Sequence, residues 1–99
     1  MQVWVDGIKP PPKGEWMWTK SVNATEFLLS TCGAVDKISI GSSAGEYECM
    51  GGDYINILWW ILENAKAKVK SIEVHSDSPL RQMEFDEMIK AIMKGRRRV

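Results

Sequence analysis

Hydrophobic and polar positions along the chain follow two periods, one typical of strands and the other typical of helices. Four short apolar runs that end in turn residues predict strands. Three longer segments with apolar residues three and four positions apart predict helices. The predicted strands are residues 3–5, 15–19, 38–40 and 71–76, and the helices begin near Ser21, Asp53 and Ser78.

The predicted helices carry start and stop signals of their own. Ser21 and Asn23 both suit the N-cap of the first helix, and Gly33 suits its end. Ser78 followed by Pro79 is a typical start for the third helix. Its inward residues are predicted to be Leu80, Phe85, Met88, Ile89 and Ile92.

The second helix has the strongest apolar stripe of the chain. Apolar side chains recur three and four positions apart, which predicts one continuous buried face. Trp59 is expected to widen this face, whereas Trp60 lies to the other side and is expected to be exposed or to pack on another chain. The stripe consists of Tyr54, Ile57, Leu58, Ile61, Leu62 and Ala65.

Strands that alternate with helices of this length predict a parallel sheet with right-handed crossovers. We therefore expect a small three-layer α/β domain with a mainly parallel four-stranded sheet and three helices. With 99 residues the chain is long enough for one domain, and 44% hydrophobic residues suit a globular protein. Residues 94–99 are expected to form a flexible basic tail.

Charge and cysteine content indicate which cellular compartment and which partners to expect. Five of the 13 basic residues lie in the last eleven positions, and such a charge run is usually a solvated end, so a nucleic-acid partner is not favoured. Cys32 and Cys49 lack the spacing of metal ligands. The first residues lack the basic flank and the long apolar run of a signal peptide. No apolar run approaches the length of a membrane span. These features predict a cytoplasmic protein without a membrane partner.

Polar and small residues gather where three predicted strands end. Asp6 follows the first strand, Gly41, Ser42 and Ser43 follow the third, and His75-Ser76 ends the fourth. In an open α/β sheet, ligands bind beyond the carboxyl ends of the strands. We therefore expect these side chains to share one site.

Four segments resemble, in order along the chain, the motifs of the cyclic-phosphate processing receiver domain family. The resemblance implies a receiver-like, flavodoxin-like fold and a site for phosphate chemistry at the strand ends. The segments are Trp4–Pro12, Ser39–Gly45, Gly51–Ile55 with a tryptophan in the helix that follows, and His75–Pro79.

The acidic residues of the family pattern are mostly missing. Its paired acids correspond to Asp6 and Gly7, its two central acids to Gly41 and Ser43, and its central histidine to Ser42. A magnesium ion prefers two or more carboxylates, and phosphoryl transfer to the protein needs a nucleophile such as aspartate. We therefore predict no metal site, no cofactor and no metal-dependent phosphatase, so that the chain would be a pseudoenzyme.

The remaining residues suit an anion. The loop from Gly41 offers backbone N–H groups and the hydroxyls of Ser42 and Ser43. His75 and Ser76 can donate to the same anion, and the charge partners are predicted to be Lys9 and Arg81. The favoured function is a non-catalytic module that binds a phosphate-bearing small molecule, a nucleotide or a protein partner.

Other interpretations stay open at this point. A metal-independent phosphoesterase would use His75 as general acid or base, assisted by Ser76 or Ser43. A protein-interaction domain would use Trp60 and the methionines of the last helix, and a homodimer is left open. His75 can also be a plain edge-strand residue, Asp6 a turn former and the serine-glycine loop a simple connection.

Overall fold

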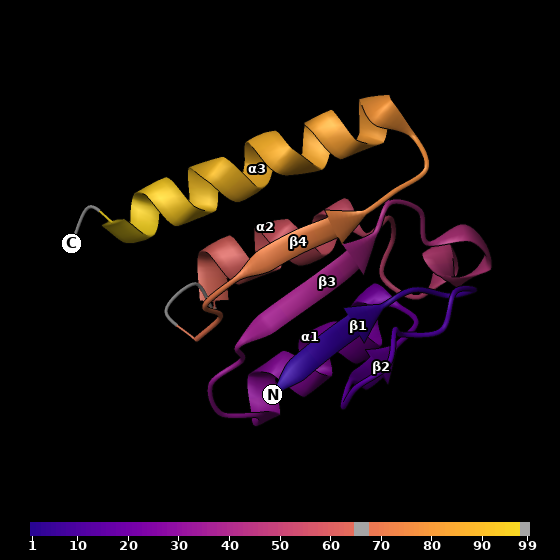
Figure 1. The fold of residues 1–99 in the computed structure, drawn as a ribbon, viewed down its shortest axis with the longest axis horizontal. Helices are drawn as coiled ribbons and strands as arrows, with labels where there is room; N and C mark the ends of the chain where they lie inside the picture. Colours follow the sequence, from indigo (N-terminus) through magenta and orange to yellow (C-terminus); the bar gives the residue numbers. More distant parts are fainter. Residues whose placement is uncertain (65–67, 98–99) are drawn as a thin grey trace.

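A four-stranded sheet organises the molecule, and all of its strands are parallel. The computed structural model describes residues 1–64 and 68–97, with side chains as far as residue 94. The strands lie in the order β2-β1-β3-β4 and finish at the same end of the sheet (Figure 1). Their bounds are Gln2–Val5 (β1), Met17–Thr19 (β2), Lys37–Gly41 (β3) and Ile72–His75 (β4).

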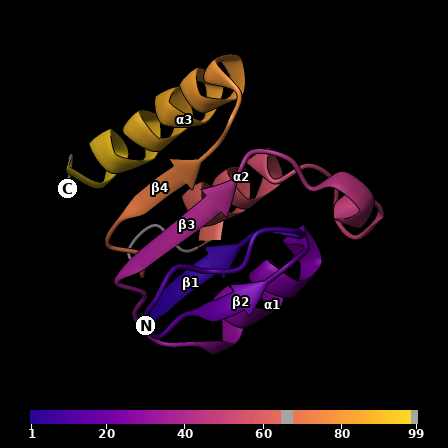
Figure 2. The ribbon, with the colours of Figure 1, turned by 45° about the vertical axis from the view of Figure 1, so that its right-hand side comes forward.

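Three α-helices complete the predicted α/β domain. Helices α1 (Val22–Thr31) and α2 (Ile55–Asn64) lie behind the sheet and cover one face, and α3 (Pro79–Arg97) runs along β4 (Figures 1 and 2). A short 3₁₀ helix, η1 (Gly45–Cys49), follows β3. The small α/β fold with a parallel four-stranded sheet and three helices is therefore confirmed. Because α3 reaches Arg97, four residues of the expected flexible tail are helical, and residues 98–99 lie outside the described part.

The cap signals read from the sequence act as predicted at two helices. The hydroxyl of Ser21 accepts the N–H of Ala24 at the start of α1. Ser78 precedes Pro79, the first residue of α3, and its hydroxyl accepts the N–H of Arg81. Helix α1 ends at Thr31 with Cys32 as its C-cap, so the predicted stop residue Gly33 comes directly after the cap.

The hydrophobic core lies between the sheet and the helices. Alternate residues of β1 and β3 point into it, and the predicted stripe of α2 meets them from the other side. Ala65, the last member of the predicted stripe, lies outside the described residues. The fully buried members of the core include Val3, Val5, Ile38, Ile40, Tyr54, Ile57, Leu58, Ile61, Phe85 and Ile92.

The exposure predicted for three side chains is wrong. Trp59 is 49% exposed, whereas Trp60 packs against the core. Each residue turns a helix by about 100°, which puts Trp59 nearly opposite the buried stripe of α2. The same rotation turns Leu80 away from Phe85, so Leu80 is 79% exposed rather than inward.

The other face of the sheet carries an aromatic and polar row. Register pairs Trp4 with Ser39 and Gly41 with His75, and these side chains point away from the α1–α2 layer. The ring of Trp4 stacks on that of His75, with centroids 3.8 Å apart and planes 4° from parallel. The row therefore leads to the carboxyl end of the strands, where the predicted site lies.

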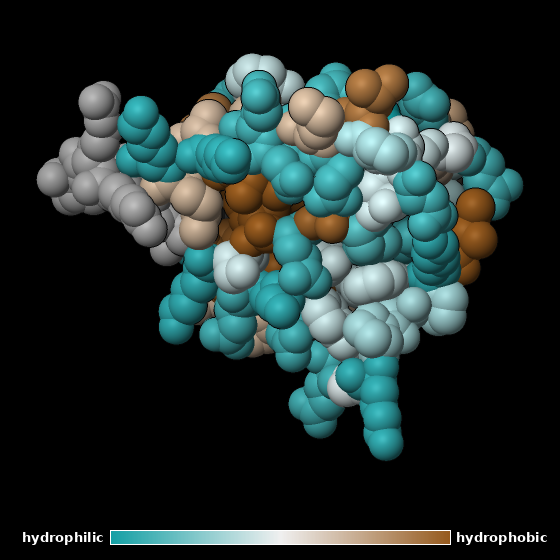
Figure 3. Space-filling model, turned by 45° about the horizontal axis from the view of Figure 1, so that its top comes forward, coloured by the Kyte–Doolittle hydropathy of each residue, from teal (hydrophilic) through white to brown (hydrophobic). Residues whose placement is uncertain are grey.

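The surface is mainly hydrophilic in the view of Figure 3, where hydrophobic residues show in separate areas. Within residues 1–64 and 68–97, none of the helices has the length and apolar character needed to cross a bilayer. Both cysteines are free; Cys32 is half-buried and Cys49 is exposed.

Candidate functional site

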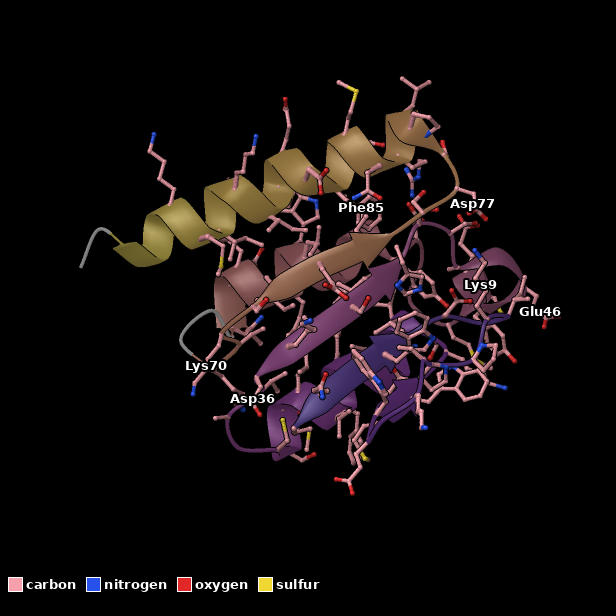
Figure 4. The ribbon with its side chains drawn as sticks, viewed as in Figure 1. Lys9, Asp36, Glu46, Lys70, Asp77 and Phe85 are labelled. Carbon is pink, nitrogen blue, oxygen red and sulfur yellow. The ribbon has the colours of Figure 1, made fainter. Side chains whose placement is uncertain are left out.

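A pocket of about 170 Å³ lies beyond the ends of β1, β3 and β4. We call it the rim pocket. The structure brings six of the predicted site residues together there, and Figure 4 shows Lys9 and Asp77 at this end of the molecule. The other two predicted site residues do not line the pocket: Gly41 lies next to Asp6 and His75, and Arg81 contacts Ser42. The lining residues are Asp6, Ile8, Lys9, Ser42, Ser43, His75, Ser76 and Asp77.

The imidazole of His75 is held on both of its nitrogens. Its Nε2 atom lies 2.9 Å from Oδ2 of Asp6, and its Nδ1 atom lies 2.9 Å from Oγ of Ser39. The stacked ring of Trp4 fixes the plane of the imidazole as well. A neutral imidazole would donate from one nitrogen and accept on the other, whereas a protonated one would donate from both. In either state the ring is fully engaged with protein groups.

Ser39, the first residue of the Ser39–Gly45 segment, belongs to the site although no role was predicted for it. It is completely buried and lies in β3 between Ile38 and Ile40. A hydroxyl at the centre of an apolar strand needs a hydrogen-bond partner, and this need was the available signal. Ser39 meets it through His75 and thereby fixes the orientation of the ring.

Asp6 acts both as a turn former and as part of the site. Its Oδ1 atom accepts the backbone N–H groups of Ile8 and Lys9, each at 2.8 Å, while Oδ2 faces His75. Burial by itself raises the pKa of Asp6, but the two N–H groups and His75 outweigh it and hold the pKa below its ordinary value of 3.8. The carboxylate is therefore charged at neutral pH, and all of its charge faces donors.

Two positions that the resemblance assigns to acids are glycines packed against other side chains. A Cβ atom on Gly41 would lie 3.0 Å from Oδ2 of Asp6 and 3.3 Å from Nε2 of His75. A Cβ atom on Gly7 would lie 2.7 Å from the ring of Tyr47. The space for those acids is thus taken by the Asp6–His75 pair and by Tyr47. Among the described residues, no three His, Cys, Asp or Glu side chains are grouped to hold a metal ion.

Lys9 lines the rim pocket and forms an ion pair with Asp77. The Nζ atom of Lys9 lies 2.9 Å from Oδ2 of Asp77, and the two side chains are 54% and 88% exposed. The bond with Asp77 raises the pKa of Lys9. An exposed pair of this kind is held weakly, so Lys9 is able to exchange Asp77 for another anion.

Ser76 lines the rim pocket, but its hydroxyl serves the turn before α3. Its Oγ atom accepts the N–H of Ser78 at 3.0 Å and donates to the carbonyl of the same residue at 3.2 Å. Both functions of the hydroxyl are therefore used locally. Ser42 and Ser43 contribute the other two hydroxyls of the pocket lining.

Arg81 stabilises the loop after β3 by binding the carbonyl of Ser42. Its Nε and Nη2 atoms donate to the carbonyl of Ser42 at 3.2 and 2.9 Å, and its guanidinium also pairs with Asp53 and Glu84. The side chain therefore fixes Ser42 and the approach to α2 in place. It positions the loop, rather than presenting its charge to the pocket as predicted.

A separate cavity, of about 460 Å³, lies beside β2. Its lining includes Trp16, Met17 and Glu15 but brings together no cluster of polar side chains like that of the rim pocket. The candidate chemistry of the described residues therefore lies at the rim.

Comparison with protein-family models, with curated proteins and with solved structures finds no match to this chain. The resemblance to the cyclic-phosphate processing receiver family stays a prediction that rests on the four motifs. The case for a function rests on the geometry of the rim pocket.

Proposed function

We propose that the chain is a receiver-like module that binds a phosphate-bearing small molecule in the rim pocket, without a metal ion and without catalysing a reaction. The observation that carries this proposal is that hydrogen-bond donors already face both oxygens of the charged Asp6 carboxylate. Two backbone N–H groups and His75 already face its oxygens, so its charge opposes an incoming anion less than a free carboxylate would.

The groups that remain available around the pocket are suited to phosphate. The hydroxyls of Ser42 and Ser43 can donate to phosphate oxygens, and the ammonium of Lys9 supplies a positive charge. In the structure Lys9 forms an exposed ion pair with Asp77. We infer that a phosphate group takes the place of Asp77 on Lys9.

Several contacts favour binding over catalysis. A general acid or base must come within hydrogen-bond reach of the substrate. Both nitrogens of His75 are engaged by Asp6 and Ser39. Ser39 is fully buried, which keeps its hydroxyl away from a substrate as a nucleophile. The hydroxyl of Ser76 is committed to the turn before α3.

Titration calorimetry with inorganic phosphate in excess EDTA tests the proposal. Lys9→Met should weaken binding and Asp77→Asn should strengthen it, each by about three- to tenfold, because one removes the phosphate partner and the other its competitor. Lys37→Met and Glu73→Gln are matched controls, since these residues form a separate ion pair at 3.6 Å on the sheet. Binding that requires magnesium, or that ignores Lys9 and Asp77, would overturn the proposal.

A turnover assay separates the module from the phosphoesterase alternative. A cyclic nucleotide incubated with the protein should remain intact, because no ring nitrogen of His75 is free for proton transfer. Hydrolysis that disappears in His75→Ala but survives EDTA would instead favour the metal-independent enzyme.

A further inference from the structure

A second cavity, of about 400 Å³, adjoins the rim pocket. Ile8 and Ser43 line both cavities, so the two spaces meet at these side chains. We call the second space the Tyr47 cavity. Figure 4 shows Glu46, one of its lining residues, at the same end of the molecule as Lys9.

We propose that the two cavities form one site for a nucleoside monophosphate, with the phosphate in the rim pocket and the nucleoside in the Tyr47 cavity. This inference rests on the proposed function and names the class of its ligand. It accounts for cavity size, for the side chains of η1 and for the position of Ile8.

The sizes of the cavities suit an ester better than free phosphate. Small-molecule sites usually have volumes of about 300–1,000 Å³. The rim pocket, at about 170 Å³, is too small for such a ligand, whereas the Tyr47 cavity adds about 400 Å³. A ligand whose phosphate fills the first space therefore has room for a ring system in the second.

The lining of the Tyr47 cavity offers an aromatic surface, a carboxylate and little obstruction. The ring of Tyr47 packs over Gly7 so closely that a Cβ atom there would lie 2.7 Å away. A ring supported in this way can stack on a base or sugar. Glu46 supplies a carboxylate for sugar hydroxyls, the group that acidic residues recognise in nucleotide sites. Gly45 also lines the cavity, and the position of its missing Cβ atom has no neighbour within 4 Å.

Ile8 lies where the two cavities meet, and its side chain is 85% exposed. Its backbone is fixed, because its N–H donates to Oδ1 of Asp6 at 2.8 Å. An isoleucine held in water between two cavities gains burial when a ligand spans them. Ile8 is thus placed to cover the sugar of a bound nucleotide.

Calorimetry in EDTA with inorganic phosphate, AMP and adenosine tests the inference. AMP should bind at least about tenfold more tightly than phosphate, since the nucleoside adds buried surface. Glu46→Gln, at a residue that lines only the Tyr47 cavity, should bring the affinity for AMP several-fold closer to that for phosphate, with phosphate binding unchanged. Ile8 lines both cavities, so Ile8→Ser should weaken the binding of AMP by a larger factor than the binding of phosphate. Leu80→Ser is the matched control, because Leu80 is 79% exposed and lines neither cavity.

The outcomes separate the two proposals. If phosphate binds but AMP binds no better, or if Ile8→Ser behaves like Leu80→Ser, the nucleotide inference is overturned and the phosphate module stands. Loss of AMP binding in Lys9→Met would support a single site, because Lys9 lines the rim pocket and not the Tyr47 cavity. If adenosine bound as tightly as AMP, the phosphate would contribute nothing to binding, and the inference would be contradicted. Absence of binding by phosphate and AMP alike overturns both proposals.

Discussion

The Nε2 atom of His75 lies 2.9 Å from Oδ2 of Asp6, although 69 positions separate the two residues in sequence. The contact joins the ends of β1 and β4, which are not neighbours in the sheet because β3 runs between them. It therefore has to pass over Gly41, the residue of β3 that pairs with His75. The absence of a side chain at Gly41 is what allows the two strand ends to touch.

Adding a methyl group at Gly41 should disturb this contact. Its Cβ atom would lie 3.0 Å from Oδ2 of Asp6 and 3.3 Å from Nε2 of His75, so the pair would have to move apart. We expect Gly41→Ala to lower the free energy of unfolding by about 1–3 kcal/mol, measured by urea denaturation.

Gly33→Ala is the control for this substitution. A Cβ atom at Gly33 would meet nothing within 4 Å, and the residue follows the end of α1. It should leave stability unchanged or raise it by up to about 1 kcal/mol, because alanine restricts the unfolded chain. Equal effects of the two substitutions would contradict the role given to Gly41.

Asp6 should make stability depend on pH. Its pKa is lower in the folded protein than its ordinary value of 3.8. Such a carboxyl group stabilises the fold above the unfolded pKa, and the contribution is lost as the pH falls through the folded pKa. We therefore expect Asp6→Asn to cost about 1–2 kcal/mol of unfolding free energy at pH 7, and the difference from the unchanged protein to shrink below about pH 4.

Urea denaturation of both proteins from pH 7 to pH 2.5 measures this difference. Asp77→Asn serves as control, since the side chain of Asp77 is 88% exposed and should contribute less than about 0.5 kcal/mol. A penalty for Asp6→Asn that stays constant down to pH 2.5 would mean that the charge of Asp6 does not stabilise the fold.

The elements and the meeting of Asp6 with His75 could be predicted from local signals. Period, caps and the alternation of strands with helices determine the parallel sheet. In a parallel sheet all strand ends lie on one side, so residues that follow the strands must converge. The start of α3 at Ser78-Pro79 and the apolar stripe of α2 could likewise be predicted from residues close together in the sequence.

The partners of long side chains could not be predicted in this way. Arg81 reaches Ser42 and Asp53 instead of the pocket, because a guanidinium with several donors is drawn to unpaired carbonyl and carboxylate oxygens. Likewise, the sequence does not show that Ser39 faces His75. That pairing depends on the register between β3 and β4, which only the folded sheet defines.

Replacing the guanidinium of Arg81 with an ammonium should loosen the loop after β3. Arg81 donates twice to the carbonyl of Ser42 while pairing with Asp53, and one ammonium cannot match this planar arrangement. We expect Arg81→Lys to lower the free energy of unfolding by about 1–2 kcal/mol.

Thermal and urea denaturation measure the effect of Arg81→Lys. Glu84→Gln is a useful comparison, because it removes only the more exposed ion pair of the same guanidinium and should cost less than about 0.5 kcal/mol. If Arg81→Lys proves no more costly than Glu84→Gln, the bonds to Ser42 and Asp53 do not support the loop.

The packing of Tyr47 over Gly7 can be tested by a double-mutant cycle. A Cβ atom on Gly7 would lie 2.7 Å from Cδ2 of Tyr47, so Gly7→Ala must push the ring away. We expect this substitution alone to cost about 1–3 kcal/mol of unfolding free energy, because the overlap is with a ring packed on the backbone. In a Tyr47→Ala background the overlap is gone, and the cost of Gly7→Ala should fall below about 0.5 kcal/mol. A cost that is the same in both backgrounds would show that Tyr47 does not occupy the space over Gly7. The acid that the family resemblance places at this position would then have room to fit.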